Sequence, residues 1–217
     1  MQEFKTVSLA DQVFERLESD IIAGVYPRDE ILTELKLVEQ LGVSRTPIRE
    51  ALRRLSQERL IEDTSKGSRV LGITVEDLMD IMEIRKRIEG LAAYYAVGNL
   101  TEDGLGQLRR VSELQDFYFE KRDLDHLRQM DDQFHNLIYS LSGRAVLQDT
   151  LRPLHRKTQR YRKQSISDDN RLAQSIREHK AIFDAIVAKN AELAAELMTK
   201  HISNAKEYMV GRHYGNG

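Results

Sequence analysis

Four residues of metal-ligand type interrupt apolar stripes on three predicted helices in the second half of this 217-residue chain. Asp131 and His135 are four residues apart, so both side chains project from the buried face of one helix. His179 takes the place of an apolar residue in the stripe of a second helix, and His201 does so in a third. We therefore expect one carboxylate and three imidazoles to point into the same core.

A divalent cation would satisfy these four groups at once. An unpaired buried carboxylate is costly, and three buried imidazoles each need partners. Nitrogen and oxygen donors suit Zn best, with Ni, Mn, Co and Fe as alternatives, and the absence of thiolates argues against a soft-metal site. Two plainer interpretations remain: the histidines are core residues satisfied by hydrogen bonds, or the metal is purely structural. We predict one divalent ion per chain, held by Asp131, His135, His179 and His201.

A second group with recognisable chemistry lies near the N-terminus. Arg45, Arg49 and Arg53 recur at four-residue spacing and form a row along one side of a predicted helix, with Thr46 beside the row and Ser44 before it. Arginine can donate two hydrogen bonds to guanine and can also clamp phosphates. An ordinary solvated helix would be the plainer reading. The face away from the row is apolar: Ile48, Ala51, Leu52 and Leu55.

The residues before this row predict a helix-turn-helix. A short helix over about 34–41 is followed by Gly42, where a helix commonly ends in the left-handed conformation. Ser44 can cap the next helix, and Pro47 is tolerated in a first turn. A tight turn between two helices favours a DNA-recognition helix, so we expect Ser44, Arg45, Thr46, Arg49 and Arg53 to contact DNA.

Two short strands are predicted behind the recognition helix, over residues 60–63 and 68–71. Such a hairpin is the wing of a winged helix. We expect Lys66, Gly67 and Arg69, at its tip and returning strand, to reach a phosphate or the minor groove.

The distribution of charge along the N-terminal part of the chain supports a DNA-binding surface at the predicted helix and wing, although the whole chain has a net charge of only −2. Residues 1–43 carry 4 basic and 9 acidic side chains, whereas residues 44–72 carry 7 basic and 4 acidic ones. Positive charge therefore begins at the predicted recognition helix, as expected for an edge that meets phosphate.

The remainder of the chain reads as helix only. We predict a mainly α protein with a winged helix-turn-helix domain over residues 1–72 and an all-α bundle of about six helices over residues 73–217. The expected bundle helices are 75–97, 102–120, 123–141, 144–164, 171–188 and 190–210.

Composition places the chain in a broad class. Cysteine is absent, which excludes a disulfide framework and fits a reducing compartment. We find no signal peptide and no apolar run near the roughly 18 residues of a membrane helix. These features predict a cytoplasmic protein with no membrane partner.

The N-terminal block resembles the winged-helix domain of the GntR family of bacterial transcription regulators. The run Ser-Arg-Thr-Pro-Ile-Arg-Glu-Ala-Leu over residues 44–52 is its most specific part. Arg28 departs from the pattern, because the family usually has glycine after the proline of the first turn. The other matching residues are Gly24, Pro27, Leu32, Glu34, Leu41, Gly42, Val43, Leu55, Glu58, Leu60, Ile61 and Gly67.

Residues 75–210 resemble the C-terminal ligand-binding domain of the FadR-type GntR subgroup, the FCD domain. In similar metal-containing members the aspartate and three histidines hold a divalent ion, and a small carboxylate effector completes its coordination. The resemblance also makes Arg85 a candidate for the effector's carboxylate, with a salt bridge to Glu89 or to another helix as the alternative. The matching segments are Glu83–Glu89, Asp131–His135, Glu178–Ile186 and His201.

These resemblances imply a metabolite-responsive regulator and not an enzyme. It would be a homodimer that binds a double-stranded operator with an inverted repeat, most simply as a repressor, and a small organic or sugar acid would switch its operator affinity. The alternative from another class is a metal-dependent hydrolase or lyase of a small acid with an accessory nucleic-acid-binding domain.

Overall fold

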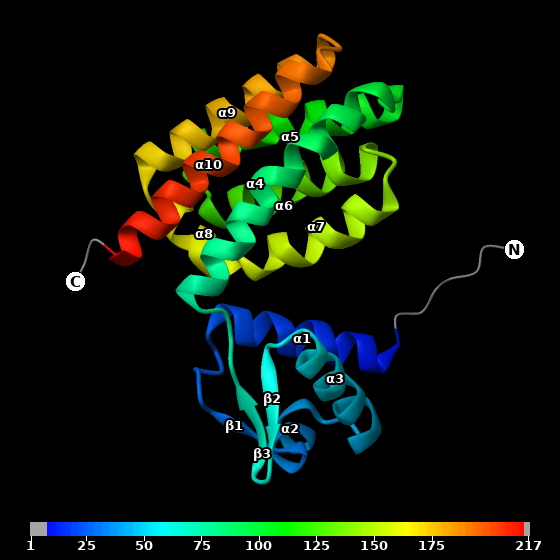
Figure 1. The fold of residues 1–217 in the computed structure, drawn as a ribbon, viewed down its shortest axis with the longest axis vertical. Coiled ribbons are helices and arrows are strands. Elements are labelled where there is room, and N and C mark those ends of the chain that lie inside the picture. The colour runs from blue at the N-terminus through cyan, green and yellow to red at the C-terminus, as the bar shows by residue number, and fades with distance from the viewer. Residues whose placement is uncertain (1–7, 215–217) are drawn as a thin grey trace, which may run out of the picture. The chain divides into compact units, whose positions relative to one another are not determined.

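The computed structural model describes residues 8–214, without the side chains of 163–165 and 212–214, and divides into two compact units after Thr74 (Figure 1). Each unit has its own core. Among the described residues, no helix is both long enough and apolar enough to cross a membrane.

The N-terminal unit is a winged helix-turn-helix. Its three strands form one antiparallel sheet in the order β1-β3-β2. The expected helix-turn-helix and hairpin are therefore confirmed, and a two-residue strand joins the hairpin. The elements are α1 (Leu9–Ala23), β1 (Ile31–Leu32), α2 (Glu34–Leu41), α3 (Arg45–Gln57), β2 (Ile61–Thr64) and β3 (Gly67–Val70).

The apolar face of α3 forms the centre of this unit. Ile48 and Leu55 are fully buried, as is Leu17 of α1, against which α3 packs. Burying each of these side chains contributes roughly 1.5–3 kcal/mol. Arg54 of α3 also contacts α1. It donates a hydrogen bond to Asp11 at 2.6 Å, and its guanidinium lies 3.9 Å from the ring centre of Phe14. Packing therefore turns the apolar back of α3 toward α1 and leaves its other side to solvent.

The turn between α2 and α3 has the predicted backbone with one difference. Gly42 has φ 65° and its N–H donates to the Val38 carbonyl at 3.0 Å, so it ends α2 in the left-handed conformation. Ser44 occupies the N-cap position of α3 with extended backbone, but its side chain makes no capping hydrogen bond. The prediction that Ser44 caps the helix is therefore wrong, and its hydroxyl is exposed instead.

Arg28 stands where the family usually has glycine, and its side chain stabilises the turn that follows α1. Its Nη1 donates to the Leu71 carbonyl at 2.8 Å, and the next residue, Asp29, takes φ 69°. The Asp29 N–H then donates to the Val70 carbonyl at 2.8 Å. The turn is thus held against the end of β3 by a side chain that glycine lacks.

The C-terminal unit contains seven helices in the part of the chain that the structure describes, one more than predicted. The expected helix over 144–164 is two helices, α7 and α8, separated at Thr158. Thr158 is buried, and its hydroxyl donates to the His155 carbonyl at 2.8 Å, which diverts the chain between them. The helices are α4 (Val75–Gly98), α5 (Glu102–Glu120), α6 (Leu124–Leu141), α7 (Ala145–Lys157), α8 (Gln159–Ile166), α9 (Asp169–Val187) and α10 (Ala191–Tyr214).

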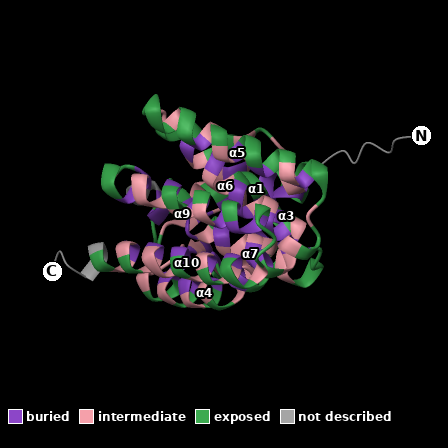
Figure 2. Ribbon diagram, turned by 90° about the horizontal axis from the view of Figure 1, so that it is seen from above, coloured by how far each residue is buried: buried purple, intermediate pink, exposed green. Residues whose placement is uncertain are grey.

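The two longest helices, α4 and α10, lie side by side (Figure 1). A Cβ at Gly90 would lie 2.6 Å from the Thr199 Oγ1 and 3.0 Å from the Ala195 carbonyl oxygen, so the two backbones approach closely there. Each helix of the unit has a buried side and an exposed side (Figure 2). The buried sides of α6, α9 and α10 carry the histidines singled out above.

We expect Gly90→Ala to lower the free energy of unfolding of the C-terminal unit by about 1–3 kcal/mol, because the new methyl has no room against α10. The matched control is Gly106→Ala on α5, where nothing lies within 4 Å of the new Cβ. Helix propensity should make the control more stable by about 0.5–1 kcal/mol. Urea unfolding followed by circular dichroism measures both, and equal stabilisation of the two variants would contradict the close approach.

Candidate functional site

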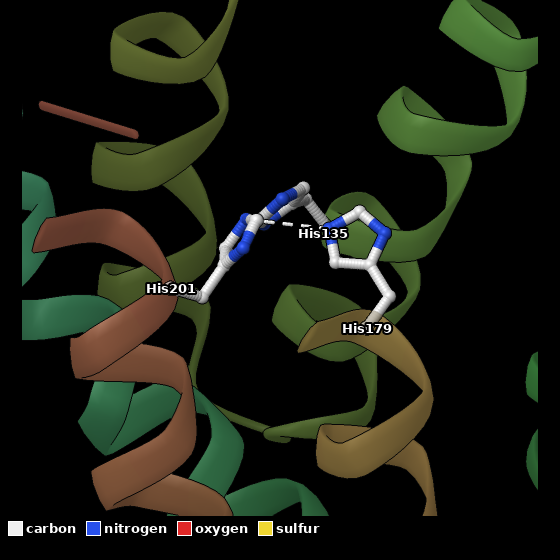
Figure 3. Close-up of side chains that lie close together, drawn as sticks. All are labelled: His135, His179 and His201. Atoms are coloured by element: carbon white, nitrogen blue, oxygen red, sulfur yellow. Dashed lines mark hydrogen bonds between the residues drawn. The ribbon is translucent and has the colours of Figure 1, made fainter. Parts of the chain in front are cut away.

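Three imidazoles from three helices meet in the core of the C-terminal unit. His135 of α6, His179 of α9 and His201 of α10 are all buried, and one ring nitrogen from each lies within 4.8 Å of the others (Figure 3). The Nε2 atoms of His179 and His201 are 3.3 Å apart. The helical spacing that placed these residues on inward stripes thus brings them to one point.

Each of the three rings is held through its Nδ1 atom by a neighbouring polar side chain. The distances to Nδ1 are 3.0 Å from Glu89 Oε2 to His135, 2.9 Å from Gln115 Nε2 to His179 and 2.7 Å from Glu178 Oε2 to His201. Such partners fix the orientation of metal-binding histidines and select which nitrogen is free. The Nε2 atoms are left to face the common centre.

The protonation of the rings suits a metal site. Burial lowers the pKa of His179 well below its usual value and also lowers that of His201, so both are neutral near pH 7. With His201 Nδ1–H donated to Glu178, its Nε2 carries a lone pair and can accept from His179 Nε2–H. A metal would require the other tautomer of His179. Gln115 can meet this need by turning its amide oxygen toward Nδ1.

Asp131 lies beside the three histidines but is engaged elsewhere. Its Oδ1 is 3.8 Å from His179 Nε2, while its Oδ2 accepts a hydrogen bond from Arg162 Nη1. Burial would raise the pKa of Asp131, but the charge of Arg162 outweighs it and keeps the carboxylate ionised. The predicted carboxylate therefore lies next to the three histidines without joining their cluster, and it is bound to Arg162, which was not predicted from the sequence.

A small cavity of about 40 Å³ adjoins the cluster. It offers room for roughly three water molecules at about 10–15 Å³ each. One side is polar and includes the cluster, and the other side is aliphatic. Its lining residues are Arg85, Gln115, Leu127, Asp131, His135, Arg162, Ile166, Arg171, Leu172, Ser175, Ile176, His179, His201, Ile202, Ala205 and Met209.

Arg85 forms the salt bridge that was considered for it, and its role toward an effector stays a prediction. Its Nε donates to Glu89 Oε1 at 2.6 Å, so the predicted salt bridge is present and almost fully buried. It also lies 3.0 Å from His155 Nδ1 and donates to Thr158 at 3.1 Å. Because Arg85 lines the cavity as well, a ligand there would lie next to its guanidinium.

Several residues that surround the histidine cluster were not predicted from the sequence. Arg171 donates to Glu178 at 3.1 Å, and Glu178 also accepts from Asn204 at 2.6 Å. The contact of Glu178 with His201 was not predicted from the sequence either. Arg171 and Glu178 are seven residues apart on α9, which puts them on one face and could have signalled the pair.

The exposed side of α3 carries the expected DNA-contacting residues. Ser44, Arg45, Thr46, Arg49 and Arg53 are all exposed, whereas Pro47 and Ile48 are buried. Arg49 Nε donates to Glu34 of α2 at 2.8 Å while its side chain remains 64% exposed. This surface ion pair is weak enough for a phosphate or base to displace.

The wing is shaped by its glycine. Gly67 has φ 133°, and a Cβ there would lie 2.7 Å from the Leu32 carbonyl oxygen, so β1 can approach the hairpin only because this side chain is absent. Lys66 at the tip is exposed. Arg69 is half-exposed and is held by Glu62, with Asp29 at 3.6 Å.

Comparison with known proteins gives matches over both units. Residues 9–70 match the family described as bacterial regulatory proteins, gntR family, and residues 80–204 match the FCD domain. The chain is 26% identical over 200 residues to the uncharacterized HTH-type transcriptional regulator YdhC of Bacillus subtilis, covering 91% of this chain and 89% of that protein. It is 27% identical over 203 residues to the HTH-type transcriptional repressor RspR of Escherichia coli, covering 93% and 89%. The solved structure of E. coli McbR/YncC superposes with a TM-score of 0.81 at 25% identity, covering 96% of this chain and all of that one.

The Glu178 contacts predict a pH dependence of stability in the metal-free protein. Burial alone would raise the pKa of Glu178, but hydrogen bonds from His201 and Asn204 lower it to about 2, against 4.5 ordinarily. The unfolded chain therefore takes up the proton first as the pH falls. The stabilisation is complete above about pH 4.5 and is lost toward pH 2.

We accordingly expect Glu178→Gln to cost about 2–3 kcal/mol of unfolding free energy at pH 7, and the difference from wild type to shrink steadily below pH 4.5. The control is Glu196→Gln at an exposed position of α10, which should differ from wild type by less than about 0.5 kcal/mol. Urea unfolding at several pH values tests this, and a difference that stays constant from pH 7 to pH 2.5 would refute it.

Proposed function

Because this chain belongs to the GntR family of bacterial regulatory proteins and carries an FCD domain, we propose that it is a repressor whose operator affinity is switched by a small acid bound at a divalent metal. The family and the relatives named above are DNA-binding transcriptional regulators and not enzymes. This argues against the metal-dependent hydrolase or lyase considered from the sequence.

The observation that carries the metal part of the proposal is the arrangement of the three histidines. Their Nδ1 atoms are each tied to Glu89, Gln115 or Glu178, and one nitrogen of each lies within reach of one ion. A core that only needed satisfied histidines would not require nitrogen atoms from three helices to face one another. The donor set of three imidazoles and a carboxylate fits Zn, with Ni, Mn, Co and Fe as alternatives.

In this proposal His135, His179, His201 and Asp131 hold the ion. When bound, the ion supplies a positive centre that a carboxylate can bind. Glu89 and Glu178 keep the two imidazoles that they contact in the metal-binding tautomer, since each accepts an Nδ1–H. Arg85 lies in the same cavity wall and offers donors to the acid.

The N-terminal unit would read DNA through α3 and the wing. The side chains of Arg45, Thr46, Arg49 and Arg53 would enter the major groove, and Ser44 would donate its free hydroxyl to a phosphate. Lys66, Gly67 and Arg69 would meet the backbone or the minor groove. In a homodimer, two such units would bind the half-sites of an inverted repeat about one helical turn apart.

The acid would act by differential binding. It shifts the regulator between operator-competent and incompetent forms only if it binds one of them more tightly. Arg85 and Glu89, which contact the site, lie on α4, and this helix begins at the first residue after the N-terminal unit. In this proposal, α4 would carry a change at the cavity toward the DNA-binding unit.

We expect Arg45→Ala to weaken operator binding by about 1–3 kcal/mol, or roughly fivefold to 150-fold, because a bidentate base contact is lost. The control is Arg16→Ala on α1, which removes the same charge from an exposed position outside α3 and the wing. Fluorescence anisotropy with a labelled native promoter fragment at fixed salt gives both affinities. An equal loss of operator affinity in the two variants would show that only the net charge matters and would contradict a specific contact by Arg45.

For the metal, we expect wild-type protein to take up one Zn²⁺ per chain and His179→Ala to bind it at least about 100-fold more weakly, because a direct ligand is lost. His126→Ala is the matched control, since His126 is an exposed histidine of α6. Elemental analysis after dialysis and titration against a chelating indicator measure the uptake. A wild-type chain that takes up no metal would remove the metal from the proposal.

The effect of acids on operator affinity is tested with the same wild-type and His179→Ala proteins. Metal removal with a chelator should abolish any effect of carboxylic acids on operator affinity, and Zn²⁺ should restore it. The proposal fails if an acid changes the operator affinity of metal-free His179→Ala as much as it changes that of the wild type.

A further inference from the structure

Arg162 lines two hollows in the C-terminal unit. The inner one is the cavity of about 40 Å³ beside the histidines, and the outer one is a pocket of about 420 Å³ that is lined by residues of α6 and α8. Arg162 and Ile166, both on α8, line both hollows. The outer pocket is otherwise lined by Asp125, Arg128, Gln129, Asp132 and Gln159. Arg162 is therefore the one charged side chain among the described residues that these two hollows share.

Arg162 is held in place by two carboxylates. Its Nη1 donates to Asp131, and its Nη2 donates to Asp132 at 2.6 Å. Its side chain is only 10% exposed, and its Nε has no hydrogen-bond partner among the described residues. A buried N–H without a partner is uncommon and calls for an explanation, such as a ligand that is yet to bind.

With Arg162 in this position, Asp131 cannot serve the metal fully. The guanidinium and a cation at the histidines compete for the same carboxylate, since Oδ2 is bound to Arg162 while Oδ1 lies 3.8 Å from His179 Nε2. The inner cavity also has room for only about three water molecules, so a metal ion together with a carboxylic acid of several carbons needs additional space. Both conflicts end if Arg162 releases Asp131 and moves toward the outer pocket, where Asp132 still holds it.

The charges around the cavity favour a monoanion. Among the described residues, the three arginines that line the cavity are ion-paired with four carboxylates, so this network of charged groups carries one excess negative charge. A divalent ion turns this into one excess positive charge, which a monocarboxylate neutralises. A dianion would again leave an uncompensated charge in a buried site, where such charges are costly. The groups counted are Arg85, Arg162, Arg171, Glu89, Asp131, Asp132 and Glu178.

The rest of the inner wall favours an apolar chain. Leu127, Ile166, Leu172 and Ile176 form a buried cluster beside the cavity, and Ile202 and Met209 add to the aliphatic lining. Among the described lining residues, Ser175 alone carries an aliphatic hydroxyl. A polyhydroxylated acid would bury hydroxyl groups against methyl groups, at a cost for each unpaired hydroxyl.

We propose that Arg162 is a latch that exchanges Asp131 for the carboxylate of a short-chain apolar monocarboxylic acid, which enters from the outer pocket. The exchange frees Asp131 for the metal and gives the acid a bidentate partner in the guanidinium. This inference rests on the proposed metal site and narrows its effector from organic or sugar acids in general to one class.

A double-mutant cycle with Zn²⁺ alone tests the competition for Asp131. Affinities are measured with a chelating indicator for wild type, Arg162→Met, Asp131→Asn and the double variant. Arg162→Met should bind Zn²⁺ about tenfold more tightly than wild type, and the same change should matter less than about threefold in the Asp131→Asn background. Equal effects in both backgrounds, or none in wild type, would overturn the latch. Arg128→Met, which removes an arginine that lines only the outer pocket, should leave the affinity unchanged.

A second experiment uses the visible spectrum of the Co²⁺-loaded full chain with butyrate, glutarate and gluconate as probes. Butyrate should perturb the spectrum and bind at least about tenfold more tightly than the other two. Arg162→Met and Arg162→Lys should keep the cobalt spectrum but lose most of the butyrate affinity, because lysine keeps the charge without the two-armed donor. Equal binding of glutarate or gluconate, no response to butyrate, or an unaltered response in both variants would overturn the proposal.

The two experiments separate the inference from its premise. A wild-type chain that binds no Zn²⁺ or Co²⁺ removes the proposed metal site and the latch together. A chain that binds the metal but shows no coupling between Arg162 and Asp131 removes the latch alone.

Discussion

Three contacts to imidazole Nδ1 atoms determine what the C-terminal unit can do. Glu89, Gln115 and Glu178 each contact one histidine from a different direction, and together they direct the opposite sides of the rings to one centre. Without these partners a buried imidazole could turn and satisfy itself elsewhere in the core. With them, His135 and His201 direct their Nε2 atoms to a fixed point, and His179 does the same once Gln115 turns its amide oxygen toward Nδ1, so most of a metal site is arranged in advance.

The buried ion pair next to His135 also helps to fix the orientation of the histidine rings. Arg85 and Glu89 are 2% and 0% exposed and form an ion pair one helical turn apart on α4. Burial alone would raise the pKa of Glu89, but Arg85 and His135 keep it low, so the carboxylate that orients His135 stays ionised. A buried ion pair of this kind adds little net stability, because desolvation offsets the attraction. Its value here lies in fixing the charge and direction of the groups around the cavity.

Much of this arrangement followed from sequence periodicity. The inward stripes placed Asp131, His135, His179 and His201 on facing sides of three helices, and the turn glycine Gly42 marked the end of α2 as expected. The break at Thr158 was not predictable. Residues 144–164 keep a helical pattern in the sequence, and the hydrogen bond of Thr158 to the His155 carbonyl appears only in the fold. Arg162 follows that break, so its direction could not be read either. Polar partners on other helices, such as Gln115, depend on packing that no single stretch of sequence encodes.

The close contact at Gly90 has a mechanical consequence. Two helices whose backbones nearly touch cannot slide past each other by a fraction of a turn without a collision between Gly90 and Thr199. The contact therefore resists a shift of α10, which carries His201, along α4. The spacing between His201 on α10 and Glu89 on α4, the partner of His135, is thus set by the two backbones and not by flexible side chains.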